Sequence, residues 1–511
     1  MKVNQLKAGS LISYIQMALG FVVSLVYTPF LIRILGAGEY GLYNTAASAV
    51  AMLSALNLGF NSSYIRFFTK YKSNGDDDSI SRLNGLFLVI FSIMGAAALL
   101  CGLAMSFGVR FIFDRGLSDA ELHTARILLL LLSVNLAVSF PMSVFSNIIA
   151  ANERFVFLKL LGLLRTVVSP VLTLPLLLMG CRSVALAAVT VAVSFVTDVC
   201  YSYYVFAVLK NRFKFGGLDR GIFKSLFGFT AFIAVNIFID QINWNLGKII
   251  LGRFFGTEMV AVYSAGYTLY TYYQLFSTSI SGVFTPKIHN IAAGSENISQ
   301  RNLLLTDLFI RVGRIQFLVL VPVAAGMIFF GQSFVNYWAG EGYEDSYYVA
   351  LLFILSSTVA LIQNIGIEIQ RAQNKHRFRS VAYAVMAVIN LTVTIWLCRL
   401  YGAVGTAVGT SLSLIIANGF VMNIYYHKKC GINIIEFWKN IARLSVGLIA
   451  PAVLGAFLLI YFKPSDFFGL MTQIALFSAV YVTSMWFFGM NNYEKGLLKM
   501  PFRRFFKGAQ T

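Results

Sequence analysis

The sequence predicts an all-α polytopic membrane protein. We expect about fourteen transmembrane helices, in two pseudo-symmetric six-helix lobes plus two C-terminal helices, with both termini cytoplasmic. Three observations predict this class. The 511 residues are 58% hydrophobic and only 12% charged, with a mean hydropathy of +0.74, whereas soluble domains carry about 25% charged residues. A sequence pattern recurs after 220 residues, and basic residues gather in alternate loops.

Long apolar stretches define the expected helices. Windows such as 86–107, 127–151 and 446–462 reach about 18 weakly charged residues, which indicates a spanning helix. The first apolar run is too long for a signal peptide and has no cleavage site, so we expect it to be a retained helix. In chain order the helices are expected near 10–33, 41–66, 83–108, 126–150, 160–180, 183–209, 223–251, 257–283, 304–330, 347–370, 380–400, 403–426, 442–462 and 467–489.

An internal repeat assigns these helices to lobes. Arg33-Ile-Leu-Gly36 is followed seven residues after the glycine by Tyr43, and Arg253-Phe-Phe-Gly256 is followed at the same distance by Tyr263. Residues 180–187 also align on 402–409. Helices one to six therefore match seven to twelve, and an even number per repeat keeps both copies in the same orientation. The predicted parts are an N-lobe (1–214), a C-lobe (215–430), and helices thirteen and fourteen with a basic cytoplasmic tail (431–511).

The basic residues predict the orientation. With the N-terminus inside, 31 of the 40 Lys and Arg residues fall on inner segments, which is the positive-inside pattern. The net charge of +19 is then explained by inner loops held near anionic membrane lipids. No compact basic domain is present to bind nucleic acid, so no nucleic-acid partner is expected.

The sequence lacks the usual marks of an enzyme. No connecting segment is long enough for a catalytic domain, and no GxxxxGK[ST] motif is present to bind a nucleotide. The four histidines and five cysteines show neither nucleophile–base pairing nor metal-ligand spacing. Asp76-Asp77-Asp78 suggests either a metal and nucleotide-sugar site or a solvated turn, and the preceding Ser73-Asn74-Gly75 favours the turn. We expect no enzyme activity, cofactor or metal.

Helix seven carries a polar stripe that includes an acid. Asn236, Asp240, Asn243 and Gly247 share one helical face. A carboxylate at mid-membrane costs about 2.5–3.5 kcal/mol, so Asp240 either couples transport to an ion or forms a buried helix-to-helix hydrogen bond. Asp198 in helix six is a second ion-coupling candidate.

Helix eight carries a tyrosine-rich stripe. Tyr267, Tyr270 and Gln274 lie on one face, where aromatic rings with hydroxyl groups suit sugar rings. We therefore treat Asn236, Asn243, Tyr267, Tyr270 and Gln274 as sugar-facing candidates. Packing against neighbouring helices is the alternative interpretation of the tyrosines.

Several cations lie within or beside the helices. Headgroup contact by snorkelling explains most of them. Arg165 is harder to explain in this way, because it lies several residues into helix five, ahead of Pro170 and Pro175. If these cations line one cavity, the cargo should be anionic, and phosphate is the group that arginine binds best. The candidates for binding the cargo are Arg33, Arg66, Arg165, Lys248 and Arg253.

Several motifs resemble one transporter family. The segments 4–10 (NQLKAGS) and 35–43 (LGAGEYGLY) and the run Tyr27-Thr28-Pro29 are similar to the polysaccharide export and O-antigen flippase family. That family belongs to the multidrug/oligosaccharidyl-lipid/polysaccharide exporter superfamily. Asp240 followed by 248–252 (KIILG) and 262–267 (VYSAGY) resembles the start of the family's second repeat.

The resemblance implies a function. The chain would move an undecaprenyl-pyrophosphate-linked oligosaccharide from the cytoplasmic to the periplasmic leaflet of a bacterial inner membrane, by alternating access. This step would serve the synthesis of O-antigen, capsule or exopolysaccharide, with other polysaccharide-assembly membrane proteins as possible partners. Cavity cations would bind the pyrophosphate. An H⁺ or Na⁺ gradient would drive the step, with Asp240 and Asp198 as coupling residues.

Two alternatives remain open at this point. A drug or cation antiporter of the same superfamily would need an acidic, aromatic cavity, whereas this chain has few membrane acids and several cations. A membrane-embedded polysaccharide polymerase or ligase usually carries an arginine-bearing catalytic segment in a large outer loop, and no such loop is present here.

Overall fold

The computed structural model describes residues 5–112, 117–216, 220–294, 297–373, 375 and 377–497. All regular secondary structure in these ranges is helical, which confirms the all-α class. Ten helices in the described part of the chain are long and apolar enough to cross a membrane, and the chain is a multi-pass membrane protein. Two of these stretches, of 63 and 52 residues, are long enough for two crossings each. The total of fourteen and the side on which the termini lie stay predictions. His376 and the basic tail 498–511 lie outside the described residues.

The chain forms two compact units. Unit 1 comprises Met1–Ser264 with Tyr383–Thr406, and unit 2 comprises Ala265–Ala382 with Ala407–Thr511. The lobes 1–214 and 215–430 remain a prediction from the repeat.

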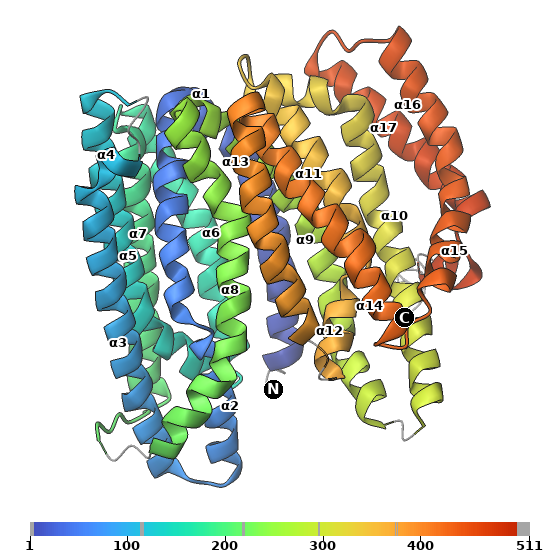
Figure 1. Ribbon diagram of the computed structural model, residues 1–511. Helices are drawn as coiled ribbons and strands as arrows, with labels where there is room; N and C mark the ends of the chain where they lie inside the picture. The colour runs from blue at the N-terminus through green and yellow to red at the C-terminus, as the bar shows by residue number, and fades with distance from the viewer. Residues whose placement is uncertain are drawn as a thin grey trace, which may run out of the picture. The chain divides into compact units, whose positions relative to one another are not determined.

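Unit 1 is a bundle in which α3 packs on α5, α1 on α6, and α5 on α7 (Figure 1). Its aromatic core lies between α2, α3 and α5, where the rings of Tyr64 and Phe87 meet edge to face at 5.1 Å. The elements are α1 (Gln5–Leu53), η1 (Ser54–Asn57), α2 (Phe60–Ser73), α3 (Asp77–Phe107), α4 (Val109–Ile112), α5 (Asp119–Ala151), α6 (Phe155–Leu178), α7 (Arg182–Tyr203), η2 (Tyr204–Val208), α8 (Arg220–Phe255), and parts of α9 (Thr257–Gly294) and α13 (Arg377–Leu414).

Unit 2 is organised around α10, which packs on α11, α15 and α17. Phe330 of α10 and Phe477 of α17 meet edge to face at 5.5 Å in its core. Besides the remaining parts of α9 and α13, its elements are α10 (Ile298–Ala339), α11 (Glu344–Ile362), α12 (Ile365–Ala372), η3 (Ile415–Met422), α14 (Asn423–Lys428), α15 (Ile434–Ser445), η4 (Val446–Leu448), α16 (Ile449–Tyr461), α17 (Phe467–Ser484) and η5 (Met485–Gly489).

Glycines with positive φ mark corresponding points of the two repeats. Gly36 (φ 73°) kinks α1, and its counterpart Gly256 (φ 82°) separates α8 from α9. Gly180 (φ 86°) precedes α7, and its counterpart Gly402 (φ 56°) kinks α13. Side chains with a Cβ rarely adopt this backbone region, so glycine is required where the chain turns sharply between helices. The aligned glycines of the two repeats therefore share a positive φ.

The acidic run at the start of α3 forms a helix cap. Asp76 is the N-cap, and its Oδ1 accepts a hydrogen bond from the Ser79 N–H at 2.9 Å. Hydrogen bonds from Ser79 lower the pKa of Asp76, because they stabilise the carboxylate. Asp78 forms ion pairs with Arg82 and Lys214. This arrangement favours the solvated turn over a metal site.

Candidate functional site

Arg165 and Asp198 lie close together in unit 1, where Arg165 is exposed on the isolated chain and Asp198 is half-buried. Arg165 of α6 donates from Nη2 to Ser194 Oγ of α7 at 2.7 Å. Asp198 lies one helical turn beyond Ser194 and interacts electrostatically with Arg165. A charge of opposite sign reduces the cost of holding a carboxylate within apolar helices. One of the predicted cargo-binding cations and one of the predicted ion-coupling acids thus form a single polar site.

The polar face of α7 extends beyond this pair. Ser194 also donates to the Thr190 carbonyl oxygen at 2.7 Å. Tyr201 lies three residues after Asp198 and interacts electrostatically with both Asp198 and Arg165. The spacing of Thr190, Ser194, Asp198 and Tyr201 places them on one side of α7. The sequence analysis identified Asp198 and Arg165 separately but did not show that Arg165 lies near Ser194, Asp198 and Tyr201.

The predicted stripe on α8 divides into two parts. Asn243 accepts a hydrogen bond from Asn390 Nδ2 at 2.8 Å, and this contact joins α8 to α13. Gly247 packs closely, since a Cβ there would lie 3.0 Å from Thr406 Cγ2. Asn243 and Gly247 therefore serve helix packing. Asp240, in contrast, is exposed on the isolated chain, and Asn236 is half-buried.

The remaining candidate cations differ in burial. Lys248 is buried in unit 1, with 8% of its surface exposed. Arg33, Arg66 and Arg253 are exposed on the isolated chain. Arg33 and Arg253 precede the corresponding glycines Gly36 and Gly256 by three residues, so they hold equivalent positions in the two repeats.

The tyrosine-rich stripe of α9 packs within unit 2. Tyr270 is 2% exposed, and its ring lies 5.6 Å from that of Phe353 on α11. Tyr267 is half-buried and contacts the same ring edge to face at 6.1 Å. Gln274 is half-buried, whereas Ser277, one turn further on, donates a buried hydrogen bond to the Leu361 carbonyl oxygen at 2.9 Å. Packing accounts for most of this stripe.

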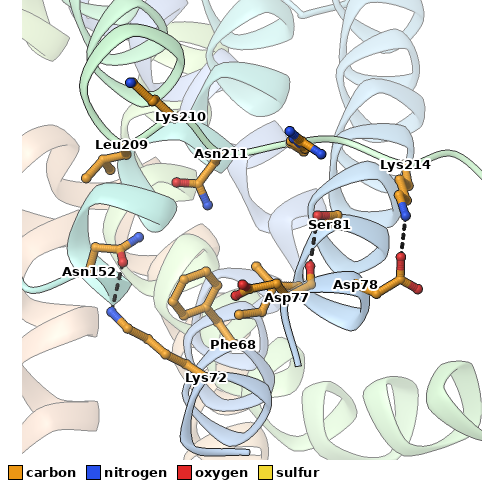
Figure 2. Close-up of a pocket in the computed structure, with 12 residues that line it drawn as sticks. Phe68, Lys72, Asp77, Asp78, Ser81, Asn152, Leu209, Lys210, Asn211 and Lys214 are labelled. Atoms are coloured by element: carbon orange, nitrogen blue, oxygen red, sulfur yellow. Dashed lines mark hydrogen bonds and ion pairs between the residues drawn. The ribbon is translucent and has the colours of Figure 1, made fainter. Parts of the chain in front are cut away.

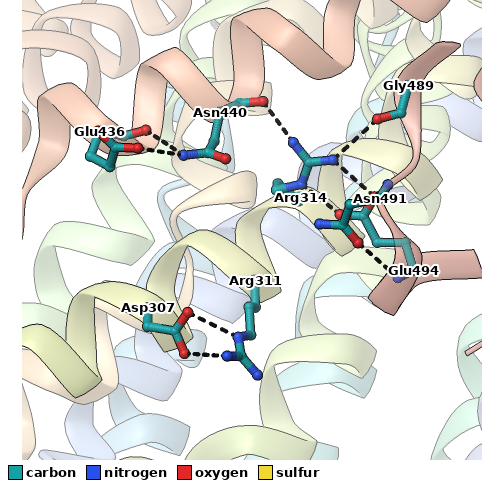
Figure 3. A network of polar contacts seen from close by, with 8 residues as sticks. All are labelled: Asp307, Arg311, Arg314, Glu436, Asn440, Gly489, Asn491 and Glu494. Carbon is teal, nitrogen blue, oxygen red and sulfur yellow. Dashed lines mark hydrogen bonds and ion pairs between the residues drawn. The ribbon is translucent and has the colours of Figure 1, made fainter. Parts of the chain in front are cut away.

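A buried ion pair in unit 2 was not expected from the sequence. Arg314 of α10 donates from Nε to Glu494 Oε1 at 2.5 Å and from Nη2 to Oε2 at 2.9 Å (Figure 3). The same guanidinium donates to the carbonyl oxygens of Asn440 and Gly489. The residues are 5% and 4% exposed. No sequence signal linked Arg314 to an acid 180 residues away.

The predicted residues fall into both compact units. Unit 1 holds all five candidate cations, both candidate acids, Asn236 and Asn243, whereas unit 2 holds Tyr267, Tyr270 and Gln274. In the described ranges no group of three or more His, Cys, Asp and Glu residues is arranged to hold a metal ion.

Long apolar helices with charged groups held between them define a polytopic transporter-like membrane protein. The sequence comparison then gives the family. Residues 6–291, more than half of the chain, match the family described as "Polysaccharide biosynthesis protein". The chain belongs to this family, which confirms the predicted resemblance. No protein of curated function matches the sequence.

Several solved structures with a similar fold are transporters. The fold resembles that of the lipid II flippase MurJ in an inward closed conformation, with a TM-score of 0.71, 15% identity, and coverage of 93% of this chain and 97% of MurJ. It also resembles an inward-facing multidrug resistance transporter of the MATE family, with a TM-score of 0.56, 13% identity, and coverage of 84% of this chain and 99% of that transporter. A third similar structure is a transporter from Pyrococcus furiosus, which belongs to the MOP superfamily as that MATE transporter does. Its TM-score is 0.57, with 14% identity and coverage of 82% of this chain and 96% of that transporter.

Proposed function

We propose that this protein is a flippase for undecaprenyl-pyrophosphate-linked oligosaccharide repeat units. It moves them from the cytoplasmic to the periplasmic leaflet of a bacterial inner membrane during synthesis of a surface polysaccharide. The observation that carries the proposal is membership of the polysaccharide biosynthesis family in a chain with the MurJ fold. MurJ is named as a flippase of lipid II, so a related fold in a polysaccharide family supports a lipid-linked saccharide as the cargo.

The Arg165–Asp198 site supports a mechanism for coupling. Arg165 attracts either the nearby Asp198 carboxylate or a phosphate of the cargo, because one guanidinium cannot fully neutralise both. Protonation of Asp198 removes its charge and frees Arg165 to bind phosphate. Loss of the proton restores the attraction between Arg165 and Asp198 and weakens the hold on the cargo. In this way proton movement drives binding on one side of the membrane and release on the other.

Asp240 is the second coupling residue in this proposal. It is exposed on a long apolar helix, and lipid cannot solvate a carboxylate, so a water-filled cavity is its favourable environment. Arg33, Arg66, Lys248 and Arg253 are proposed as further phosphate contacts. Asn236, Asn243, Tyr267, Tyr270 and Gln274 are proposed as sugar contacts, although Asn243 and Tyr270 also serve packing.

The direct test measures translocation. Purified protein in liposomes should expose an inner-leaflet lipid-linked oligosaccharide to an added glycosidase, whereas protein-free liposomes should not. In cells, deletion should cause the lipid-linked unit to accumulate on the cytoplasmic leaflet. Normal export of the polysaccharide in the deletion strain would refute the proposal.

The second candidate is a drug or cation antiporter, which the MATE-like fold favours. The TM-scores for those proteins, 0.56 and 0.60, are lower than the 0.71 for MurJ. Unimpaired glycan export together with altered resistance to cationic dyes in the deletion strain would support the antiporter.

A further inference from the structure

A cavity of about 510 Å³ lies at one end of unit 1. The end of α2, the start of α3, the residue after α5 and the segment 209–214 after η2 meet there (Figure 2). Phe68 and Ile80 form part of an apolar wall, and both are buried. This end carries the basic loops that we expect on the cytoplasmic side. It is separate from the Arg165–Asp198 site, which lies between helices.

Three cations line this cavity without an acidic partner. Lys72 donates to the amide oxygen of Asn152 at 2.8 Å, and its Nζ lies 5.7 Å from the centre of the Phe68 ring. Lys210 and Arg212 are exposed, and their charged groups have no hydrogen bond or ion pair with any residue that the structure describes. Lys214 differs, because it is already paired with Asp78. The cavity therefore presents three positive groups available to an anion.

One carboxylate in the cavity is also unpaired. Asp78 binds Lys214 and Arg82, but the Asp77 carboxylate has no hydrogen bond or ion pair with any residue that the structure describes. In Figure 2 the Asp77 carboxylate lies on the side of the cavity near Phe68, away from Lys210. A ligand that complements both the three cations and the Asp77 carboxylate carries an anionic group and a separate hydrogen-bond donor.

Buried hydrogen bonds hold the basic segment in place. Asn84 donates from Nδ2 to the Arg212 carbonyl oxygen at 3.0 Å, and Tyr64 donates to Asn84 Oδ1 at 2.6 Å. The Lys214 N–H donates to the Ser81 carbonyl oxygen at 2.9 Å. Tyr64 and Asn84 are fully buried. The cations are thus presented from a fixed backbone, which reduces the entropy lost on binding.

We propose that this cavity binds a phosphate ester that also carries an amine or a hydroxyl group. Lys72, Lys210 and Arg212 bind the phosphate, and Asp77 accepts a hydrogen bond from the amine or hydroxyl. Cavities of about 300–1,000 Å³ hold small organic ligands, so a phosphate ion alone would leave this one largely unfilled. Two sources supply this chemistry: the headgroup of a membrane phospholipid, and a soluble phosphate ester. The site does not depend on the proposed transport function.

The test measures binding to the purified full-length protein by native mass spectrometry and by thermal shift. Phosphatidylethanolamine is the lipid probe, and glycerophosphoethanolamine is the soluble probe with the same headgroup. If only the lipid binds, the ligand of the site is a membrane phospholipid. If both probes bind, the site recognises the phosphate and amine groups in either source. Failure of both probes to bind overturns the proposal.

Matched variants locate the binding. The double variant Lys210→Gln/Arg212→Gln should bind at least about tenfold more weakly, because two charge-assisted contacts are lost. Lys70→Gln is the control, since Lys70 is exposed on the same α2 helix as Lys72 but does not line the cavity. Equal weakening by Lys70→Gln would show diffuse attraction to a basic surface and would overturn the site.

A second variant tests the carboxylate and remains informative if the double variant does not fold. Asp77→Asn should weaken binding of phosphatidylethanolamine several-fold but should leave binding of phosphatidic acid unchanged or stronger. The reason is that phosphatidic acid carries the phosphate group without the amine or hydroxyl group that Asp77 is proposed to bind. An equal effect on both lipids would overturn the role assigned to Asp77.

Discussion

Gly41 of α1 lies against the backbone of Ala261 of α9, and these two residues are equivalents in the internal repeat. A Cβ built on Gly41 would lie 3.1 Å from the Ala261 nitrogen and would overlap the Thr257 carbonyl oxygen. In a two-fold arrangement, residues near the axis contact their own counterparts. The contact therefore packs the start of α9 against α1 at equivalent positions of the two repeats.

Gly41→Ala should disrupt this contact. The added methyl group overlaps a backbone oxygen, which cannot move away as a side chain can, so we expect destabilisation of about 1–3 kcal/mol. Thermal unfolding in detergent measures it. Gly38→Ala is the control, because a Cβ there would lie 3.8 Å from its nearest neighbour, an ordinary contact. Equal stability of the two variants would show that the close approach is not required.

Arg165→Ala should lower glycan transport roughly tenfold, since it removes a charged hydrogen bond to Ser194 and the cation beside Asp198. Arg165→Lys keeps the charge and should retain more activity. Transport in proteoliposomes measures the difference, with protein amount as the control. If the Ala and Lys variants transport equally, the positive charge at position 165 is not required for transport.

Asp240→Asn should reduce ion-driven transport to below about a tenth while the protein still inserts, because an amide cannot take up a proton or bind a cation as a carboxylate does. Asn390→Ala is the comparison, because Asn390 is the hydrogen-bond partner of Asn243 and is not a proposed cargo contact. It loses the hydrogen bond to Asn243 and should lower thermal stability by about 1 kcal/mol with little effect on coupling. Full gradient-driven uptake by Asp240→Asn would remove Asp240 from the coupling role.

Glu494→Gln should destabilise unit 2 by about 3–5 kcal/mol, because it leaves the buried Arg314 cation without an anionic partner. Limited proteolysis near residues 489–494 and thermal unfolding would detect the change. Asp307→Asn is the control. Its pair with Arg311 is exposed and helical, so it should cost no more than about 0.5 kcal/mol. Similar losses of stability in both variants would show that burial of the ion pair does not determine its contribution to stability.

Parts of the site were predictable and others were not. Asp198 and Arg165 were each identified because charged residues in apolar helices are costly and therefore conspicuous. Their proximity was not predictable, since they lie on different helices. The tyrosines of α9 suggested a sugar-binding face as readily as a packing face, and only the position of Phe353 on α11 showed that Tyr270 is buried.

The sequence by itself determined the class of the protein, its membrane character and the repeat. These features can be read from composition and from patterns along the chain, without knowing which helices pack together. The positive-φ glycines Gly36 and Gly256 were visible as a recurring motif for the same reason. The tertiary structure decided which groups lie next to each other: Arg165 binds Ser194 near Asp198, Arg314 pairs with Glu494, and Gly41 packs against the Ala261 backbone. Such contacts depend on how helices distant in sequence pack, and side-chain spacing along one helix carries no information about its partner.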